Sequence, residues 1–256
     1  MCKGEIRPVT PSFAISPDLP FSRNRMFCGR NDIIDTIHSF LSGSALYDVE
    51  GDARPMSDVE RDAWPMTRKT VVLYGLGGIG KSSIALEYSF RYSNSYTAVF
   101  WVDVTSGMSL SRSARRIVEH IIAEYVGQGS SYEHIASLLG LGGFLGLGGE
   151  ISSDTAAELR VTGAVRKWLA TKHNEKWLLI LDNYDDVNAV DIHLLLPTCD
   201  AGNVIITSRK SDLQMLGMTV AVDDIDEESG MELFMKSANI EELKAEGKHQ
   251  SNTFRV

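Results

Sequence analysis

The chain has 256 residues, of which 43% are hydrophobic, and it carries a formal net charge of −9. This length and composition can bury one sizeable core, or one domain and part of another. Acidic residues are spread along the chain and form a final cluster at 223–228. A nucleic-acid backbone is therefore a poor partner, and a protein or a small molecule is favoured.

The cysteines and the apolar runs bear on where the protein resides. Cys2, Cys28 and Cys199 are odd in number and far apart, which suits neither a disulfide framework nor a paired metal site. The six histidines show no ligand spacing either. No run reaches the roughly 18 apolar residues of a membrane span, and the first twenty residues lack the apolar core of a signal peptide. We therefore expect free thiols, no structural metal, no membrane span and residence in the cytosol or nucleus, of which the cytoplasmic location is favoured.

The N-terminal part reads as an arm, a helix and a linker. Residues 1–22 are punctuated by prolines and predict a flexible arm. Apolar residues spaced by three and four then predict a helix, with Asn31 or Asp32 as its N-cap. The next stretch, to residue 67, is polar and acidic and contains several glycines and prolines. We expect residues 23–66 to form this helix and a polar surface linker.

Residues 75–82, with the sequence GLGGIGKS, fit the G-x-x-x-x-G-K-[ST] phosphate loop and follow an apolar run typical of a strand. Glycines let the backbone curl around phosphate oxygens, so that several N–H groups and a helix N-terminus face one anion. Lys81 would neutralise the β- and γ-phosphates, Ser82 would bind Mg²⁺, and the Ser83 N–H would meet the α-phosphate. The predicted loop residues are Gly75, Gly77, Gly78, Ile79, Gly80, Lys81, Ser82 and Ser83.

The same residues leave a second interpretation open. Gly75, Gly77 and Gly80 also fit the G-x-G-x-x-G dinucleotide fingerprint of Rossmann folds, and Asp103 closes the next predicted strand about twenty residues later. In that fold the helix packs closely on its strand just after the third glycine, where a charged Lys81 would be a poor choice. The phosphate loop is the favoured interpretation.

Three further apolar runs, at 98–102, 177–181 and 204–206, predict strands that are buried on both faces. Strands alternating with helices indicate an α/β fold, here a doubly wound parallel sheet of about five strands with helices on both faces. We assign this P-loop core to residues 67–222. Helical patterns lie between the runs, at 84–88, 109–125 and 153–170.

Charged residues follow these predicted strands at the edge where ligands bind in parallel sheets. The Asp182 carboxylate can hold Mg²⁺ opposite Ser82, directly or through water. Arg209 ends a neighbouring strand and can reach a terminal phosphate, which would distinguish ATP from ADP. The sequence thus predicts a magnesium–nucleotide site at this edge.

A tandem hexapeptide interrupts the core at residues 139–150, reading LGLGGF and then LGLGGE. One interpretation is a flexible, partly apolar surface loop that meets a partner or a membrane. The other is a duplicated insertion with no role, which is favoured because so much glycine disfavours a membrane-inserting helix.

Together these segments resemble the NB-ARC domain of the STAND class of signalling NTPases, known from plant resistance proteins, animal apoptosome scaffolds and fungal NOD-like receptors. The resemblance implies a P-loop NTPase that binds ADP or ATP with Mg²⁺, switches signalling state in innate immunity and contacts other subunits in an oligomer. It also implies that Phe27 and Arg30, in the family's h-x-G-R segment, lie against the nucleotide. The similar segments are 27–30 (FCGR), 75–82 (GLGGIGKS), 100–103 (FWVD), 178–183 (LLILDN) and 202–209 (GNVIITSR).

The resemblance covers residues from about Phe27 to Phe234. The family continues with a Gly-Leu-Pro-Leu segment, a helical ARC region and a winged-helix module, and none of these motifs follows here. Residues 223–256 are therefore expected to be the truncated start of the ARC region or a disordered tail. One alternative function is an interaction module that has lost nucleotide affinity. A small-molecule kinase is disfavoured, because no arginine cluster follows Asp182 beyond Arg209.

The residues also bear on catalysis. Many active P-loop ATPases carry a second acidic residue directly after the Mg²⁺-binding aspartate, and this chain has Asn183 there. An amide can hydrogen-bond a water molecule but cannot take its proton. Asp185 and Asp186 are candidate substitutes, although they follow two or three residues later. We expect slow ATP hydrolysis at most.

Overall fold

The computed structural model describes residues 14–47, 53–55, 68–146 and 148–238. Its centre is a five-stranded sheet in the order β4-β5-β6-β3-β7, and every neighbouring pair of strands is parallel. The predicted doubly wound α/β sheet is confirmed. The strands are β3 (Lys69–Tyr74), β4 (Ala98–Asp103), β5 (Trp177–Asp182), β6 (Asn203–Ser208) and β7 (Met218–Ala221).

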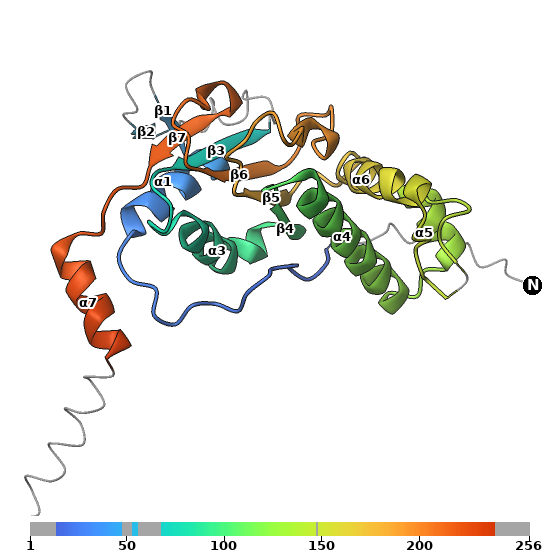
Figure 1. Cartoon of the computed structure of the whole chain (residues 1–256), viewed down its shortest axis with the longest axis horizontal. Coiled ribbons are helices and arrows are strands. Elements are labelled where there is room, and N and C mark those ends of the chain that lie inside the picture. Colours follow the sequence, from blue (N-terminus) through green and yellow to red (C-terminus); the bar gives the residue numbers. More distant parts are fainter. Residues whose placement is uncertain (1–13, 48–52, 56–67, 147, 239–256) are drawn as a thin grey trace, which may run out of the picture.

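The sheet is covered by helices on both faces, as predicted (Figure 1). Alternate residues of one strand supply the two cores: the Val71 and Leu73 side chains pack with the helices of one face, and Val72 packs with those of the other. The first face carries α1 (Asn31–Ser42) and α3 (Lys81–Tyr92); the second carries α4 (Gly107–Gly127), α5 (Tyr132–Leu139) and α6 (Thr155–Leu169).

The expected N-cap of α1 is wrong, because Asn31 and Asp32 both lie inside the helix. The N-cap position is taken by Arg30, in a left-handed conformation with φ of 62° and without a side-chain cap. The Asn31 side chain is used elsewhere, since its Oδ1 accepts a hydrogen bond of 2.8 Å from Arg91 of α3. Contact between the two helices has replaced local capping.

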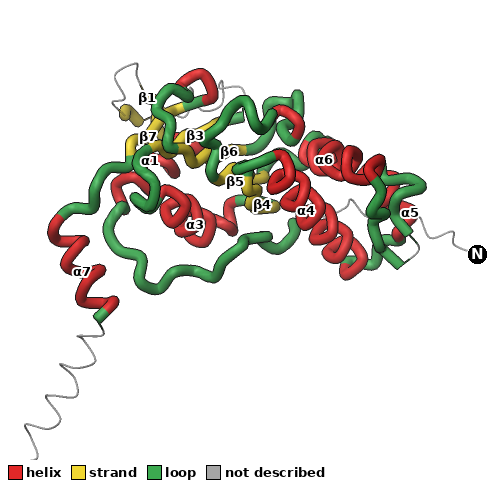
Figure 2. The backbone as a smooth tube through the Cα atoms, in the orientation of Figure 1, coloured by secondary structure: helices red, strands yellow, loops and turns green. Residues whose placement is uncertain are grey.

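The prediction of a flexible arm is wrong for residues 14–22. Figure 2 shows this segment as a long loop that runs beside β4 and α3 before it reaches α1. Ile15 is buried, and Asp18 forms a parallel bridge with Phe100 of β4. Apolar anchors and backbone pairing therefore fix an arm that its prolines marked only as irregular. Residues 1–13 lie outside the described part of the chain.

The linker after α1 contains regular structure that its composition did not predict. β1 (Ala45–Tyr47) and β2 (Ala53–Pro55) pair as a short antiparallel sheet. The rest of the expected linker, residues 48–52 and 56–67, is outside the described residues.

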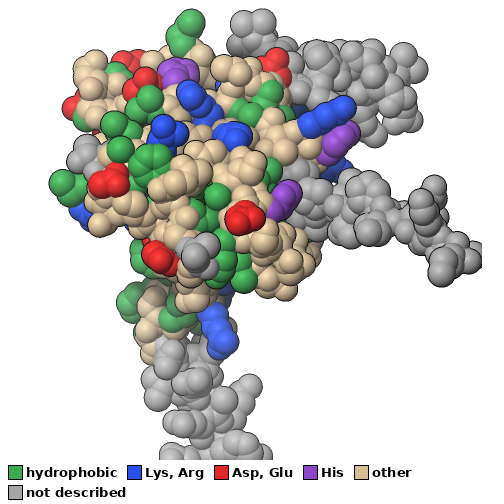
Figure 3. Space-filling model, turned by 90° about the vertical axis from the view of Figure 1, so that its right-hand side faces the viewer, with side chains coloured by type: hydrophobic (Ala, Val, Ile, Leu, Met, Phe, Trp, Pro, Cys, Tyr) green, Lys and Arg blue, Asp and Glu red, His purple; other side chains and the backbone are tan. Residues whose placement is uncertain are grey.

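The tandem hexapeptide is not a uniform flexible loop, so the less favoured of its two interpretations is wrong for the first copy. Leu139 ends α5, Gly140 forms its left-handed C-cap with φ of 74°, and Leu141 is fully buried in the core. The second copy differs, since Leu145 pairs with Ile151 in an antiparallel bridge. Figure 3 faces this end of the molecule and shows acidic and basic side chains interspersed over it.

The last described helix, α7 (Glu227–Ser237), lies in the segment expected to be either a helical region or a tail. Asp226 caps it by accepting a hydrogen bond of 2.8 Å from the Ser229 N–H. None of its residues is buried, and Figure 1 shows it projecting away from the sheet. Residues 239–256 are not described, and no helix of the described chain is long and apolar enough to cross a membrane.

Candidate functional site

The predicted phosphate loop connects the end of β3 at Tyr74 to the start of α3 at Lys81. Gly75 and Gly80 have φ values of 150° and 106°, in the region that favours glycine. A Cβ atom on Gly75 would come within 2.4 Å of the Val222 carbonyl oxygen, whereas one on Gly80 would meet open space. Glycine is thus required for close packing at the start of the loop and for backbone conformation at its end.

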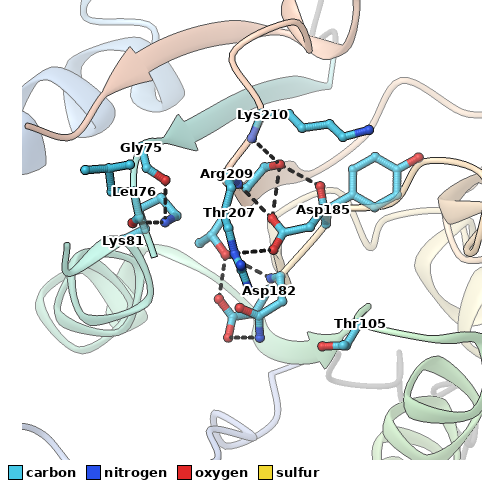
Figure 4. A network of polar contacts seen from close by, with 12 residues as sticks. Gly75, Leu76, Lys81, Thr105, Asp182, Asp185, Thr207, Arg209 and Lys210 are labelled. Atoms are coloured by element: carbon cyan, nitrogen blue, oxygen red, sulfur yellow. Dashed lines mark hydrogen bonds and ion pairs between the residues drawn. The ribbon is translucent and has the colours of Figure 1, made fainter. Parts of the chain in front are cut away.

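Lys81 is 9% exposed, and its ammonium group lies inside the loop (Figure 4). It donates hydrogen bonds of 2.9 Å and 2.7 Å to the carbonyl oxygens of Gly75 and Leu76. No ion pair among the described residues includes Lys81. Burial lowers its pKa, and Asp185 opposes that shift from a distance. A buried cation without a paired carboxylate is a favourable place for an anion.

Asp182, at the end of β5, is the second buried charge and is 8% exposed. Its Oδ1 accepts hydrogen bonds of 2.6 Å from the hydroxyls of Ser82 and Thr207, and its Oδ2 accepts one of 3.2 Å from Asn183. Burial raises the pKa of this carboxyl, although the Ser82 and Thr207 hydrogen bonds partly offset the shift, and Asp103 on the neighbouring strand adds to it.

These oxygen atoms suit a hard divalent cation whose remaining ligands come from a phosphate and from water. Ser82 and Asp182 place a hydroxyl and a carboxylate side by side at the edge of the loop. Among the described residues no group of three or more His, Cys, Asp or Glu side chains could hold a metal ion. Mg²⁺ suits such a sparse site, because it is held by one or two protein oxygens together with water and phosphate oxygens.

The ends of β5 and β6 bring Asp185 and Arg209 together. Arg209 Nε lies 2.8 Å from Asp185 Oδ2, and the Arg209 N–H donates to Asp185 Oδ1 at 2.7 Å. The left-handed backbone of Asn183, with φ of 66°, turns the chain so that Asp185 comes back to this edge. Asp186 points elsewhere and accepts a hydrogen bond of 3.0 Å from Asn188 N.

A hollow of about 220 Å³ joins these groups, which is the size of a phosphate chain rather than of a whole nucleotide. Thr207 and Ser208 belong to it although sequence reasoning did not assign them a role; their place at the end of a strand beside β3 was the available signal. Its lining residues are Gly77, Gly78, Gly80, Lys81, Ser82, Ser83, Asn183, Asp185, Thr207, Ser208 and Arg209.

Phe27 and Arg30 do not line this hollow. The Arg30 guanidinium donates to the Asp223 carbonyl oxygen at 2.6 Å, close in sequence to Val222, whose carbonyl approaches Gly75. Phe27 packs against the α1–α3 core, with the Arg91 guanidinium 5.9 Å from its ring. The h-x-G-R segment is thus joined to the start of the loop through residues 222–224, and its contact with a nucleotide stays a prediction.

The family model of the NB-ARC domain matches residues 65–244 of this sequence. The chain belongs to the NB-ARC domain family. The match covers β3 to α7 and every residue that lines the hollow, whereas Phe27 and Arg30 lie outside it. With Lys81 directed into the loop, it excludes the dinucleotide-binding interpretation of the glycines.

Two solved structures resemble the NB-ARC chain weakly. One is a STAND signal-transduction ATPase with a tetratricopeptide-repeat sensor from Pyrococcus horikoshii, at 20% identity and a TM-score of 0.41 over 90% of this chain. The other is the Drosophila origin recognition complex bound to DNA, at 18% identity and a TM-score of 0.36 over 76%. The chain spans 27% and 42% of those two chains. A search of curated proteins gave no match.

Proposed function

We propose that this NB-ARC domain binds ADP and ATP with Mg²⁺ and acts as a nucleotide-occupancy switch that hydrolyses ATP slowly at most. The observation that carries the proposal is a pair of incompletely compensated buried charges: Lys81 lines the hollow, and Asp182 is hydrogen-bonded to the lining residues Ser82 and Thr207. Lys81 is bound by two backbone carbonyls, and Asp182 keeps a raised pKa despite its hydrogen bonds. A magnesium-bound polyphosphate supplies the opposite charge to both.

Different residues would bind the phosphates, the Mg²⁺ ion and the base. Lys81 would exchange its carbonyl partners for β- and γ-phosphate oxygens, and the N–H groups that begin α3 would face the same phosphates. Ser82 and Asp182 would hold Mg²⁺, which neutralises the charge of the phosphates when bound. The base would lie outside the 220 Å³ hollow, towards the h-x-G-R segment with Phe27 and Arg30.

The Asp185–Arg209 ion pair gives the switch a physical basis. Its two side chains, at the mouth of the hollow, are 31% and 70% exposed, so the pair is weakly held. A γ-phosphate competes with Asp185 for the Arg209 guanidinium, whereas the shorter ADP does not reach as far. ATP would therefore release Asp185 and the segment that carries it, and ADP would leave the pair closed.

The same geometry accounts for slow hydrolysis. Asp185 is the one carboxylate among the residues that line the hollow, and its oxygens already accept from Arg209. Asn183 cannot accept the proton of an attacking water, and Asp186 is turned away. Asp185 remains the candidate base once Arg209 has moved.

Calorimetric titration of the purified protein with ADP and ATP, with and without Mg²⁺, tests the proposal. We expect both nucleotides to bind, and Mg²⁺ to strengthen ATP binding more than ADP binding. Arg209→Ala should weaken ATP and spare ADP. Absence of binding by either nucleotide to the folded protein would instead support the alternative, an interaction module without nucleotide affinity.

The setting of this switch is also a proposal. Following the family resemblance, we infer cytoplasmic signalling of the NOD-like receptor type in innate immunity, with other protein subunits as partners in an oligomer. Cys28 and Cys199 are free thiols in the structure, which suits a reducing compartment. Microscopy of the tagged chain in its own cells, and its molar mass in solution with ADP or ATP, would test these two points.

A further inference from the structure

The ordered N-terminal arm lies on an edge of the sheet that would otherwise be open. β4 is a terminal strand of the sheet, so the backbone groups on its outer side have no strand to pair with. The Ile15 N–H donates to the Thr97 carbonyl at 2.8 Å, and the Asp18 N–H donates to the Val99 carbonyl at 2.9 Å. The arm thus occupies the place of a sixth, parallel strand.

Side chains of α4 also contact the arm through hydrogen bonds and an ion pair. Ser16 donates its hydroxyl to Glu124, and its carbonyl oxygen lies 2.8 Å from His120 Nε2. Arg116 lies 3.4 Å from the Asp18 carboxylate and also donates to the Trp101 carbonyl at 2.5 Å. Arg116 therefore both binds the arm and satisfies the next outward carbonyl of β4, which fixes where the pairing stops.

Apolar contacts anchor the arm on both faces of the sheet. Ile15 is 7% exposed and belongs to the core that α4 and α6 form, whereas Leu19 packs against the core of α1 and α3. Pro17 and Pro20 lack the N–H group that strand pairing needs, so they limit further pairing along the arm. The edge of β4 and the facing side of α4, on which the arm lies, form the surface that we call the β4–α4 groove.

The contacts of the arm are specific, but within the described residues they leave one buried polar atom of the arm without a hydrogen-bond partner. Asp18 Oδ2 is buried without a hydrogen-bond partner in the described structure. Residues 20–30, which connect the arm to α1, contain no helix or strand, as Figure 2 shows. A segment held by strand pairing and joined through an irregular connection is the usual element of an exchange between identical chains.

We propose that the β4–α4 groove is a peptide-binding site of the strand-addition kind, and that the arm of a second copy of this chain can occupy it in place of the chain's own. Main-chain hydrogen bonds to Thr97 and Val99 supply affinity, as in other cases of strand addition. The apolar position for Ile15 and the Arg116 contact for Asp18 supply selectivity. This inference is independent of the proposed nucleotide switch.

The first test uses a labelled synthetic peptide of residues 14–22 and the full-length Ile15→Asp variant, whose own arm cannot seat its buried anchor. Fluorescence polarisation should show binding to the variant that is at least about tenfold tighter than to the parent, because the parent's arm fills the groove. A peptide carrying Ile15→Asp is the control and should not bind. Failure of the parent-sequence peptide to bind the folded variant would overturn the proposal.

The second test asks whether a second copy supplies the arm. The Ile15→Asp chain keeps its groove and loses its arm, and the Arg116→Asp chain keeps its arm and loses a groove contact. Each alone should elute as a monomer in size-exclusion chromatography, and their mixture should form a heterodimer. If the mixture still elutes as two monomers at protein concentrations above the Kd measured for the peptide, exchange of the arm is ruled out. Should Ile15→Asp fail to fold by circular dichroism, Asp18→Arg, which leaves the apolar anchor intact, takes its place in both tests.

Discussion

Two clusters of buried charge, one at the start of α3 and one in its middle, differ in how completely they are paired. At its start, Lys81 is bound by carbonyls alone, and Asp182 has a pKa raised by burial. Further along, Glu87 is 4% exposed, but Arg23 contacts it at 2.6 Å and 3.1 Å and Arg91 at 2.7 Å. Burial alone would raise the pKa of Glu87, and these hydrogen bonds outweigh it, so the pKa is lowered.

The difference separates structural charge from functional charge. Glu87 is satisfied within the chain, and through Arg23 it ties the N-terminal segment to α3. Lys81 and Asp182 are not satisfied to the same degree, so folding leaves them at a cost that a magnesium-bound phosphate removes. We expect substitutions at the first pair to act on binding, and substitutions at Glu87 to act on stability.

The largest expected effect is that of Lys81→Ala. Loss of the only cation inside the loop should weaken ADP and ATP binding by about a hundredfold or more, since charged hydrogen bonds to phosphate are lost in a buried site. The thermal unfolding temperature should not fall, because a poorly compensated charge is removed. Lys210→Ala is the matched control: Figure 4 shows its side chain directed away from the loop. Equal nucleotide affinity in the Lys81 variant and the parent would contradict the account.

Asp182→Asn should weaken Mg²⁺-dependent ATP binding by about tenfold or more, and ADP binding less, since the metal bridges β- and γ-phosphates. Asp186→Asn is the control. The same substitution should raise the stability of the folded protein at neutral pH. Because the folded pKa of Asp182 lies above its unfolded value, the parent loses stability relative to the variant as the pH rises above about 4. A variant that is no more stable at pH 7 than at pH 4, relative to the parent, would contradict this.

Asn183→Asp should raise the ATPase rate by about tenfold or more, because a well-placed general base accelerates such a reaction by roughly 100-fold or more. ADP affinity should scarcely change, since the shorter nucleotide does not approach this position. Single-turnover assays with ATP would separate the chemical step from product release. An unchanged rate would show that Asn183 does not limit hydrolysis and that another group controls it.

The smallest expected effect is that of Glu87→Gln, which should lower stability by about 1 kcal/mol while nucleotide affinity is unchanged. Because the folded pKa of Glu87 lies below its unfolded value, the parent's advantage should be present at neutral pH and be lost as the pH falls below about 4. Urea unfolding at both pH values measures it, with the exposed Glu119→Gln as control. An advantage that grows at low pH would contradict the pairing argument.

Sequence reasoning succeeded where one local pattern fixes one structure. The phosphate loop, the buried strands before Asp103, Asp182 and Ser208, and the helices between them follow from glycine spacing and apolar periodicity. The strand-end rule also placed Asp182 and Arg209 at one edge of the sheet, and both lie there.

It failed where contacts distant in sequence decide. The arm is ordered because Ile15 is buried in a core formed by residues far away in the sequence. Asn31 does not cap α1, because its side chain accepts a hydrogen bond from Arg91 instead. Leu141 is buried although its glycine-rich surroundings indicate a loop. β7 was not identified, since three half-buried residues and one exposed residue at a sheet edge give no periodic signal. None of these outcomes is encoded within a ten-residue window.

The central claim is that the incompletely paired charges at the start of α3 exist to hold a nucleotide. Mass spectrometry of the small molecules released when the freshly purified protein is denatured tests it most directly. We predict ADP or ATP in near-stoichiometric amount from the parent and from Lys210→Ala, and none from Lys81→Ala. A parent that releases no nucleotide, or that releases NAD, would contradict the claim.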